Sequence, residues 1–403
     1  MRIERAPRSR TAWSRTSAVF ATATLTVAVA VSGAVAPAPA AAALAPAGAD
    51  GSVLSVQPLD PALWVPGTAH GYRLTYISRN GSGAKAVTSG EVLLPAGPAP
   101  AGGWPVISWA HGTSGLADAC APSRVGPAEK ARDFSYLATW MQQGYAIVGT
   151  DYAGLGTPGL PAYLNGASES HNIVDMVTAA RAFANTKLPV TNHLAAKYMI
   201  IGQSQGGGAA IYAARYATAL GGPQLSYRGA VGTGTPANIE KALLPLGPKV
   251  PPAALTPGIT SYIAYIFASL RQFHPELGID GILTAEGKKY LAMAEQECVD
   301  AFDTKLAGVN VGDWFTQPVA LLPNFVQTLS DYMAMPTSGF DTPFFMANGL
   351  ADTDVPFAIV APYVAQLKAN REPVDFHTYP TDHNGTMAAS LPDSIPFVRA
   401  QLH

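Results

Sequence analysis

One serine in the chain lies in a setting that could make it a nucleophile. Residues 202–206 read Gly-Gln-Ser-Gln-Gly, with Ser204 at the centre. The apolar run Tyr198–Ile201 predicts a strand before the serine, and a helix is expected to begin near Gly206. A serine on such a tight strand-to-helix turn needs glycines two positions away, because side chains there would collide. The pattern therefore predicts Ser204 as the nucleophile of a covalent reaction.

A serine hydroxyl is a weak nucleophile unless a general base takes its proton, and four histidines follow it in the chain. His274 falls in a predicted helical insertion, His377 inside a predicted strand, and His403 is the last residue. His383 comes in a loop directly after the last predicted strand. Loops at the carboxyl ends of parallel strands are where catalytic groups gather. We therefore expect His383 to be the base.

The acid that orients the histidine is expected between the serine and the histidine in chain order. Residues 348–356 follow a predicted strand, precede a predicted helix and contain Asp352 and Asp354. We favour Asp352, because Asp354 lies closer to the helix start, where a carboxylate is commonly a cap. Asp354 and then Asp382 are the alternatives. A calcium loop is excluded, since the remaining oxygen ligands and their spacing are missing.

Two backbone N–H groups are needed to hold the oxyanion that forms when a serine attacks a carbonyl. Gln205, the residue after the serine, is expected to supply one. Thr113 or Gly112, in a loop after an early predicted strand, would supply the other. His111 precedes the nucleophile and fits a structural role that shapes this loop.

These residues must be positioned by strands and helices that alternate along the chain from about residue 52, a pattern that predicts an α/β domain with a largely parallel sheet. An early antiparallel pair is expected at Tyr72–Ser78 and Ala86–Leu94, joined by a Gly-rich turn. Further strands and helices are expected as follows: strands at 106–109, 145–148, 198–201, 230–232, 344–347 and 374–379, and helices at 133–143, 173–184, from about 206, and 357–367. Between about 237 and 336 the segments read as helical, which predicts a cap or lid inserted into one domain that spans 51–403.

The first 40 residues resemble a secretory signal peptide. Five arginines precede an apolar run from Ser17 to Val35, and an Ala-Pro-Ala sequence follows at 38–40. We expect cleavage at about 40–50 and a secreted protein, extracellular or associated with the cell envelope; a permanent membrane anchor is the alternative. Export favours a disulfide between the only two cysteines, Cys120 and Cys298, over two separate buried thiols.

Without residues 1–40 the chain carries 20 basic and 26 acidic residues, a formal net charge of −6. No basic patch remains that would indicate nucleic-acid binding. Two cysteines without a nearby histidine cluster make a poor zinc site, so no metal is expected.

Several motifs occur in the order found in the secretory lipase family of the α/β-hydrolase superfamily, which this chain resembles over roughly 55–400. They are His111–Gly115, Cys120–Ser123, Asp151–Gly156, the glycine-flanked Ser204, the helical insertion, Gly349–Pro356, and His383 with Gly385-Thr386. The resemblance implies an α/β-hydrolase fold with a helical cap, activity on triacylglycerols and simpler esters, and no cofactor. It also implies Ser204, Asp352 and His383 as the catalytic triad, with the Cys120–Cys298 bridge joining core and cap.

The leading hypothesis is therefore a lipase or esterase that works through an acyl-enzyme, with Gln205 and Thr113 holding the oxyanion. A serine peptidase on the same fold and a catalytically silent binding protein are the alternatives. We expect a monomer that acts on a small-molecule or lipid ester and touches lipid surfaces transiently. The apolar segment Ile259–Leu270 fits an acyl tunnel, a lipid-facing surface or a buried cap helix equally well.

Overall fold

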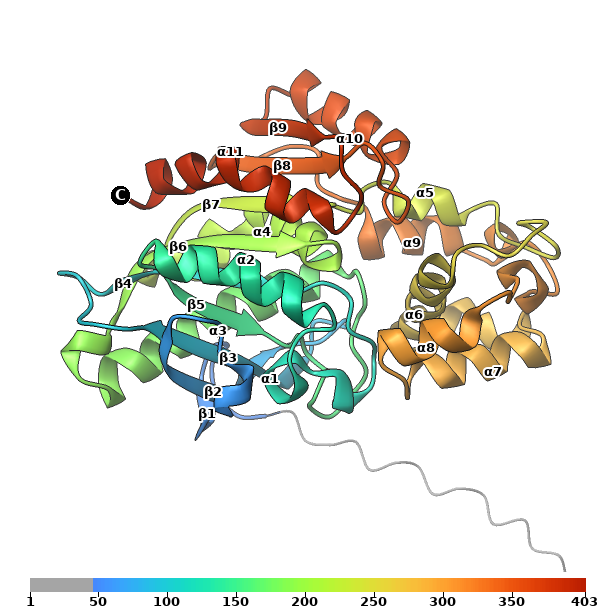
Figure 1. The fold of residues 1–403 in the computed structure, drawn as a ribbon. Coiled ribbons are helices and arrows are strands. Elements are labelled where there is room, and N and C mark those ends of the chain that lie inside the picture. The colour runs from blue at the N-terminus through green and yellow to red at the C-terminus, as the bar shows by residue number, and fades with distance from the viewer. Residues whose placement is uncertain (1–45) are drawn as a thin grey trace, which may run out of the picture. The chain divides into compact units, whose positions relative to one another are not determined.

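A nine-stranded sheet runs through residues 46–403, the part of the chain that the computed structural model describes; the predicted signal peptide, 1–40, lies outside these residues. The strand order is β1-β2-β3-β5-β4-β6-β7-β8-β9 (Figure 1). The strands are β1 (Val53–Pro58), β2 (Thr68–Arg79), β3 (Lys85–Pro95), β4 (Trp104–Ala110), β5 (Ala146–Thr150), β6 (Leu194–Gln203), β7 (Ser226–Thr233), β8 (Phe344–Gly349) and β9 (Val374–Tyr379). Strands β4 to β9 pair in parallel, which confirms the predicted α/β class.

The early antiparallel pair is confirmed as β2 and β3, with Tyr72 opposite Val92. Their turn is held by the Asn80 side chain, whose Oδ1 accepts hydrogen bonds from the Ser82 and Ala84 N–H groups at 3.0 and 3.1 Å. Strand β1 is absent from the elements predicted by sequence. It is an edge strand whose residues are mostly exposed, so it lacks the apolar alternation that marks a half-buried strand.

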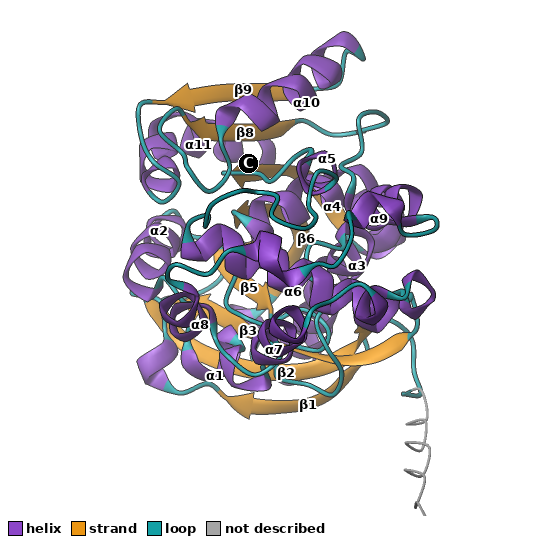
Figure 2. Ribbon diagram, turned by 90° about the vertical axis from the view of Figure 1, so that its right-hand side faces the viewer, coloured by secondary structure: helices purple, strands orange, loops and turns teal. Residues whose placement is uncertain are grey.

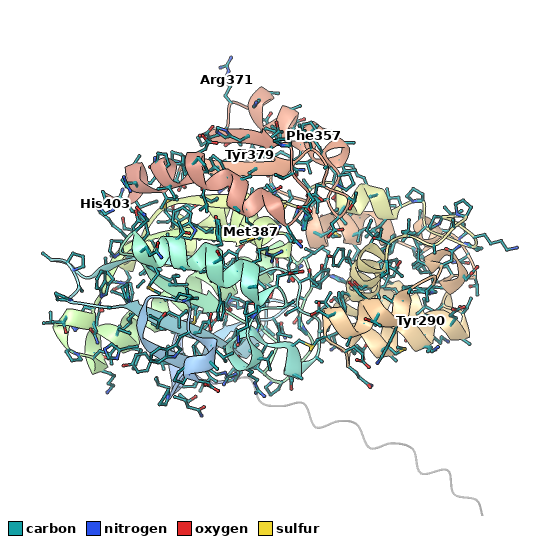
Figure 3. All side chains as sticks on the ribbon, viewed as in Figure 1. Tyr290, Phe357, Arg371, Tyr379, Met387 and His403 are labelled. Carbon is teal, nitrogen blue, oxygen red and sulfur yellow. A yellow bond between two sulfur atoms is a disulfide. The ribbon has the colours of Figure 1, made fainter. Side chains whose placement is uncertain are left out.

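Helices cover both faces of the sheet, because successive strand residues point to opposite faces (Figure 2). In β4, Val106 packs on one face together with residues of α3 (Gly166–Lys187), α4 (Gln205–Gly221) and α10 (Phe357–Ala369). The next residue, Ile107, packs on the other face with α2 (Lys130–Gln142) and α11 (Gly385–Leu402). Met387, labelled in Figure 3, is one of the α11 residues buried in this second layer.

The chain leaves the sheet after β7 and returns at β8, and the intervening residues 234–343, which we call the helical insertion, contain the predicted 237–336 segment. Its helices are α5 (Ile239–Leu243), α6 (Pro257–Phe273), α7 (Ala285–Ala294), α8 (Val299–Leu306) and α9 (Phe325–Met333). It has an apolar core of its own, in which Phe267, Trp314 and Phe325 are fully buried. Figure 1 shows the insertion, in yellow to orange, on the side toward which the parallel strands point.

Helix α11 also lies outside the predicted elements, and its two prolines, Pro392 and Pro396, weaken the local helix signal. The short α1 (Pro122–Val125) follows the loop after β4. Within residues 46–403, no helix combines the length and the apolarity needed to cross a bilayer.

Candidate active site

Ser204 sits on the turn between β6 and α4 in a strained backbone conformation, with φ 57° and ψ −123°. The turn closes only because its neighbours lack side chains. A Cβ on Gly202 would lie 2.0 Å from the Gly206 carbonyl oxygen, and a Cβ on Gly206 would lie 1.8 Å from the Ala110 carbonyl oxygen. The two glycines therefore allow the serine to project from the end of β6, as the sequence pattern predicts.

His383 and Asp352 meet at the carboxyl ends of the last two strands. Asp352 lies in the loop after β8, His383 in the loop after β9, and the distance from His383 Nδ1 to Asp352 Oδ2 is 2.7 Å. An ionised carboxylate only accepts hydrogen bonds, so Nδ1 donates and Nε2 of the neutral ring is left as the acceptor. The Asp352 side chain is fully buried, and its other oxygen accepts from the Asp354 and Val355 N–H groups at 3.0 and 2.7 Å.

The second ring nitrogen of His383 is free in the described residues, and the residue lines the nucleophile's cavity. Its Nε2 is buried without a hydrogen-bond partner in residues 46–403, and Ser204 and His383 line one cavity of about 250 Å³. The Gln203 side chain joins the end of β6 to the loop after β9, because its Nε2 donates to the His383 carbonyl at 2.9 Å. No hydrogen bond joins Ser204 to His383 in the described residues, a bond that is often long before substrate binds.

The other histidines after the serine are engaged elsewhere, in contacts with Glu276, Asp375 and Tyr145 for His274, His377 and His403, respectively. His111 lies in the loop after β4 and packs against Tyr152, with the ring centroids 4.5 Å apart and the rings tilted by 39°, which fits the expected structural role. Burial lowers the pKa of His111.

One detail of the sequence interpretation is wrong. Asp354 was expected to cap the following helix, but α10 begins after Pro356 and no side chain caps it. The Asp354 side chain instead lines the cavity of Ser204. Asp382, the third alternative for the acid, accepts the Gly385 N–H at 2.7 Å at the start of α11.

The residues expected to supply the oxyanion donors lie near the serine, one next to it in the chain and the others in the wall of its cavity. Gln205 is the first residue of α4, and its N–H, like others in the first turn of a helix, has no acceptor within the helix. Gly112 and Thr113 line the cavity, and the Thr113 hydroxyl bonds the Tyr163 hydroxyl at 2.6 Å. Both remain candidates for the second donor.

Sequence reasoning missed Glu169 on α3, which forms a hydrogen bond with the Gln205 side chain. Its Oε1 accepts from Gln205 Nε2 at 2.8 Å, and both side chains are buried. Burial raises the pKa of Glu169 to about 8. The one local signal was Asn165, whose side chain caps α3 by accepting the Ser168 N–H and thereby places Glu169 in the first turn of the helix.

The loop after β4 is held to the sheet by Asp151 and to the insertion by the disulfide. Asp151 accepts from Ser89 Oγ at 2.5 Å and from the Ser123 N–H at 2.8 Å. Cys120 and Cys298 are bonded, with their Cα atoms 5.3 Å apart, so the expected disulfide is present. It connects the loop that carries Thr113 with the start of α8.

A second cavity, of about 350 Å³, adjoins the first. Its walls are mostly apolar. They come from α5, α6 and the loop between them, with Leu243, Ile263 and Ile266 among them, and from the loop after β8 and the start of α10. Tyr262 and Asp354 line both cavities and form a shared wall. The candidate site thus offers a polar space around the serine and an apolar space next to it.

Elsewhere in the described chain, Asp50, His171 and Asp175 place possible metal-ligand atoms within 4.8 Å of one another. Arg79 already pairs with Asp50 at 2.8 Å, and the Ser78 hydroxyl donates to Asp175 at 2.7 Å. None of these residues lines the cavity of Ser204, so the group stands apart from the candidate active site.

Comparison with known proteins agrees with this architecture. The model of the secretory lipase family matches residues 123–321. Candida antarctica lipase A in its closed state superposes with a TM-score of 0.68 at 22% sequence identity, over 88% of this chain and 82% of the lipase. The rice cell wall degrading esterase LipA from Xanthomonas oryzae gives a TM-score of 0.68 at 20% identity, over 88% of this chain and 99% of the esterase.

No curated protein matches the chain by sequence. The structural matches confirm the α/β-hydrolase fold, and the family match confirms the resemblance to secretory lipases.

Proposed function

We propose that the protein is an exported serine hydrolase that cleaves carboxylic esters through an acyl-enzyme. The observation that carries the proposal is the pairing of Asp352 with His383 at 2.7 Å, while His383 Nε2 has no partner in residues 46–403 and His383 lines the same cavity as Ser204. The match to the secretory lipase family and the likeness to a lipase and an esterase support an ester as the substrate.

In the first half of the reaction, His383 Nε2 takes the proton of Ser204 Oγ as the serine attacks the ester carbonyl. The negative charge that develops on the carbonyl oxygen is held by the Gln205 N–H and by that of Thr113 or Gly112. Asp352 keeps the imidazole in the required tautomer and stabilises its positive charge. Collapse of the intermediate breaks the ester C–O bond, and His383 gives its proton to the departing alcohol oxygen.

In the second half, a water molecule replaces the alcohol. His383 takes a proton from this water, which attacks the acyl carbon, and the proton then returns to Ser204 as the carboxylic acid leaves. The apolar cavity beside Tyr262 suits the acyl chain, because burying each methylene there contributes about 0.8 kcal/mol. This assigns part of α6, the apolar segment seen in the sequence, to acyl binding.

The signal-like residues 1–40 and the disulfide support export, with the mature chain beginning between Ala41 and Asp50. The proposal is tested with p-nitrophenyl esters from acetate to palmitate. We expect the mature protein to hydrolyse at least part of the series and the Ser204→Ala variant to lose about 10³-fold or more in kcat.

The matched control is Ser135→Ala, an exposed serine on α2 that lines neither cavity. It should keep the wild-type rate. Absence of hydrolysis across the whole series by correctly folded wild-type protein would overturn the proposed function.

A further inference from the structure

The cavity around Ser204 is rich in carboxylates. Glu129, Asp300, Asp303 and Asp354 all line it. None of the four forms a salt bridge with any residue in the range 46–403. Glu129 and Asp300 are exposed at its rim, whereas Asp303 and Asp354 are partly buried. In the part of the chain that the structure describes, these four carboxylates therefore have no ion-pair partner.

Among residues 46–403, Arg132 is the only arginine or lysine that lines the cavity, and it already has partners. Arg132 Nε lies 2.8 Å from Asp133 Oδ1, and its guanidinium also bonds the Asn384 side chain. Asp133 is buried and does not line the cavity. Arg132 thus forms its ion pair with a carboxylate behind the wall, although its charge also reaches the cavity and lowers the pKa of Tyr262. With four carboxylates and one guanidinium among its lining residues, the cavity keeps an excess of negative charge.

The carboxylates influence one another across the cavity. Burial raises the pKa of Asp303, and the charges of Asp300 and Asp354 raise it further. Burial raises the pKa of Tyr262, and the charges of Asp354 and Asp303 add to this effect. Burial is the largest cause of both shifts, and the neighbouring carboxylates add to it. A hydrogen bond from Ser261 opposes the rise for Asp303, and the charge of Arg132 opposes it for Tyr262.

A second feature shows that a ligand belongs in this cavity. His383 is more than nine-tenths buried, and its unpartnered Nε2 belongs to a side chain that lines the same space as the carboxylates. The group that receives a proton from this nitrogen is the departing alcohol. Because the neighbouring apolar cavity suits the acyl chain, the acidic cavity is left for the alcohol half of the ester.

We propose that the acidic cavity selects esters whose alcohol part carries a positive charge, such as a quaternary ammonium alcohol, over neutral and anionic ones. This inference rests on the proposed ester hydrolysis and adds the substrate class to it. The carboxylates act at a distance, through the field in the cavity, so the preference should weaken with salt.

Three butyrate esters with different alcohol parts test the inference: choline, its neutral isostere 3,3-dimethylbutanol, and 3-hydroxypropanesulfonate. At about 0.01 M ionic strength we expect kcat/KM for the cationic ester to exceed that for the neutral isostere about tenfold, with the anionic ester slowest. At about 1 M the cationic-to-neutral ratio should fall to within about twofold of unity.

Variants locate the source of the preference. Asp303→Asn and Asp300→Asn should each lower the cationic-to-neutral ratio about threefold, in keeping with the modest strength of partly solvated charge interactions. Asp300 is exposed, so its variant stays informative if Asp303→Asn folds poorly. Glu286→Gln is the matched control: it removes one charge from an exposed position on α7 that lines neither cavity, and it should leave the ratio at the wild-type value.

The possible failures are distinguishable. If wild-type protein hydrolyses the neutral ester as fast as the cationic one, the charge preference is wrong while ester hydrolysis stands. A preference that persists unchanged in both aspartate variants, or that Glu286→Gln also reduces, contradicts its assignment to this cavity. Hydrolysis of none of the three esters by protein that still cleaves p-nitrophenyl esters would overturn the charge preference alone, whereas failure on both sets of esters would overturn the proposed ester hydrolysis.

Discussion

At the scale of single residues, the side chains around Ser204 are held by three different physical effects. Backbone strain at φ 57° projects the serine, and the two flanking glycines permit it. A buried hydrogen bond from Nδ1 to Asp352 fixes the ring of His383. Burial raises the pKa of Glu169 to about 8 against the opposing effect of its hydrogen bond with Gln205, so the protonated carboxyl is favoured at neutral pH.

Asp352→Asn is expected to lower kcat on p-nitrophenyl butyrate about 10⁴-fold, because an amide at this position can favour the wrong imidazole tautomer. Asp354→Asn should cost far less, since its side chain forms no hydrogen bond with His383. The control is Asp375→Asn, an exposed aspartate on β9 that lines neither cavity. A larger loss in Asp354→Asn than in Asp352→Asn would reverse the assignment of the acid.

At the scale of elements, α6 lies between two cavities, one apolar and one polar. The apolar cavity of about 350 Å³ lies against its Ile263 side, and the polar cavity of about 250 Å³ lies beyond Tyr262. The helix reaches this position because Thr256 caps its first turn and its apolar residues pack into the core of the insertion. An element that was ambiguous by composition thus acquires a definite role in the proposed reaction.

Tyr262→Ala is expected to shift the acyl preference toward longer chains, because loss of the ring widens the connection between the two cavities. Each additional buried methylene should raise kcat/KM about fourfold, the equivalent of about 0.8 kcal/mol. The measurement is the ratio of kcat/KM for octanoate to that for acetate. Tyr216→Ala, at a tyrosine 38% exposed on α4, is the control and should keep the wild-type ratio; an unchanged ratio in Tyr262→Ala would show that the ring does not separate the cavities.

At the scale of the whole molecule, the helical insertion and the sheet are linked covalently as well as by packing. The disulfide spans 178 residues of sequence and joins the loop after β4 to the start of α8. Next to it, Gly115 forms a backbone bridge with Cys298, and the Val299 N–H donates to the Ser114 carbonyl at 3.0 Å. The loop that carries a candidate oxyanion donor is therefore attached to the insertion at several adjacent points.

Removing the disulfide in a Cys120→Ser, Cys298→Ser double variant is expected to lower the free energy of unfolding by about 2–5 kcal/mol. Urea unfolding of the mature protein measures this difference. A reductant should destabilise the wild type and leave the double variant unaffected, so equal sensitivity of both proteins would contradict the role assigned to the bond.

Stability is also expected to fall as the pH rises from about 4.5 to about 8. Burial raises the pKa of Glu169 and Glu91 from 4.5 to about 8 in the folded protein, so the folded state binds more protons than the unfolded state in this window. Their contribution is fully present below pH 4.5 and is lost as the pH rises through about 8. The melting temperature should therefore decline between pH 5 and pH 9.

The variant Glu169→Gln should show a shallower decline, since its amide does not titrate and can still accept from Gln205. Glu286→Gln again serves as the control and should follow the wild-type curve. A melting temperature that rises across this range would contradict the predicted protonation of the buried carboxyls.

Much of this architecture is encoded locally. The alternation of apolar strands and helical segments predicts the parallel sheet, because strand and helix periods are properties of short stretches of chain. The glycines around Ser204 predict its turn for the same reason, since the collision they avoid involves neighbours in sequence. Chain order then makes His383 and the 348–356 segment the natural partners of the serine.

Other features depend on contacts between distant segments, which local patterns do not contain. Asp352 and Asp354 have nearly the same surroundings in sequence, and only the approach of the loop after β9 brings one of them to His383. Glu169 is one of many glutamates on helices until α3 packs beside α4 and buries it against Gln205. The acidic cavity likewise gathers carboxylates from separate segments, so its charge exists only in the folded chain, where side chains far apart in sequence share one enclosed space.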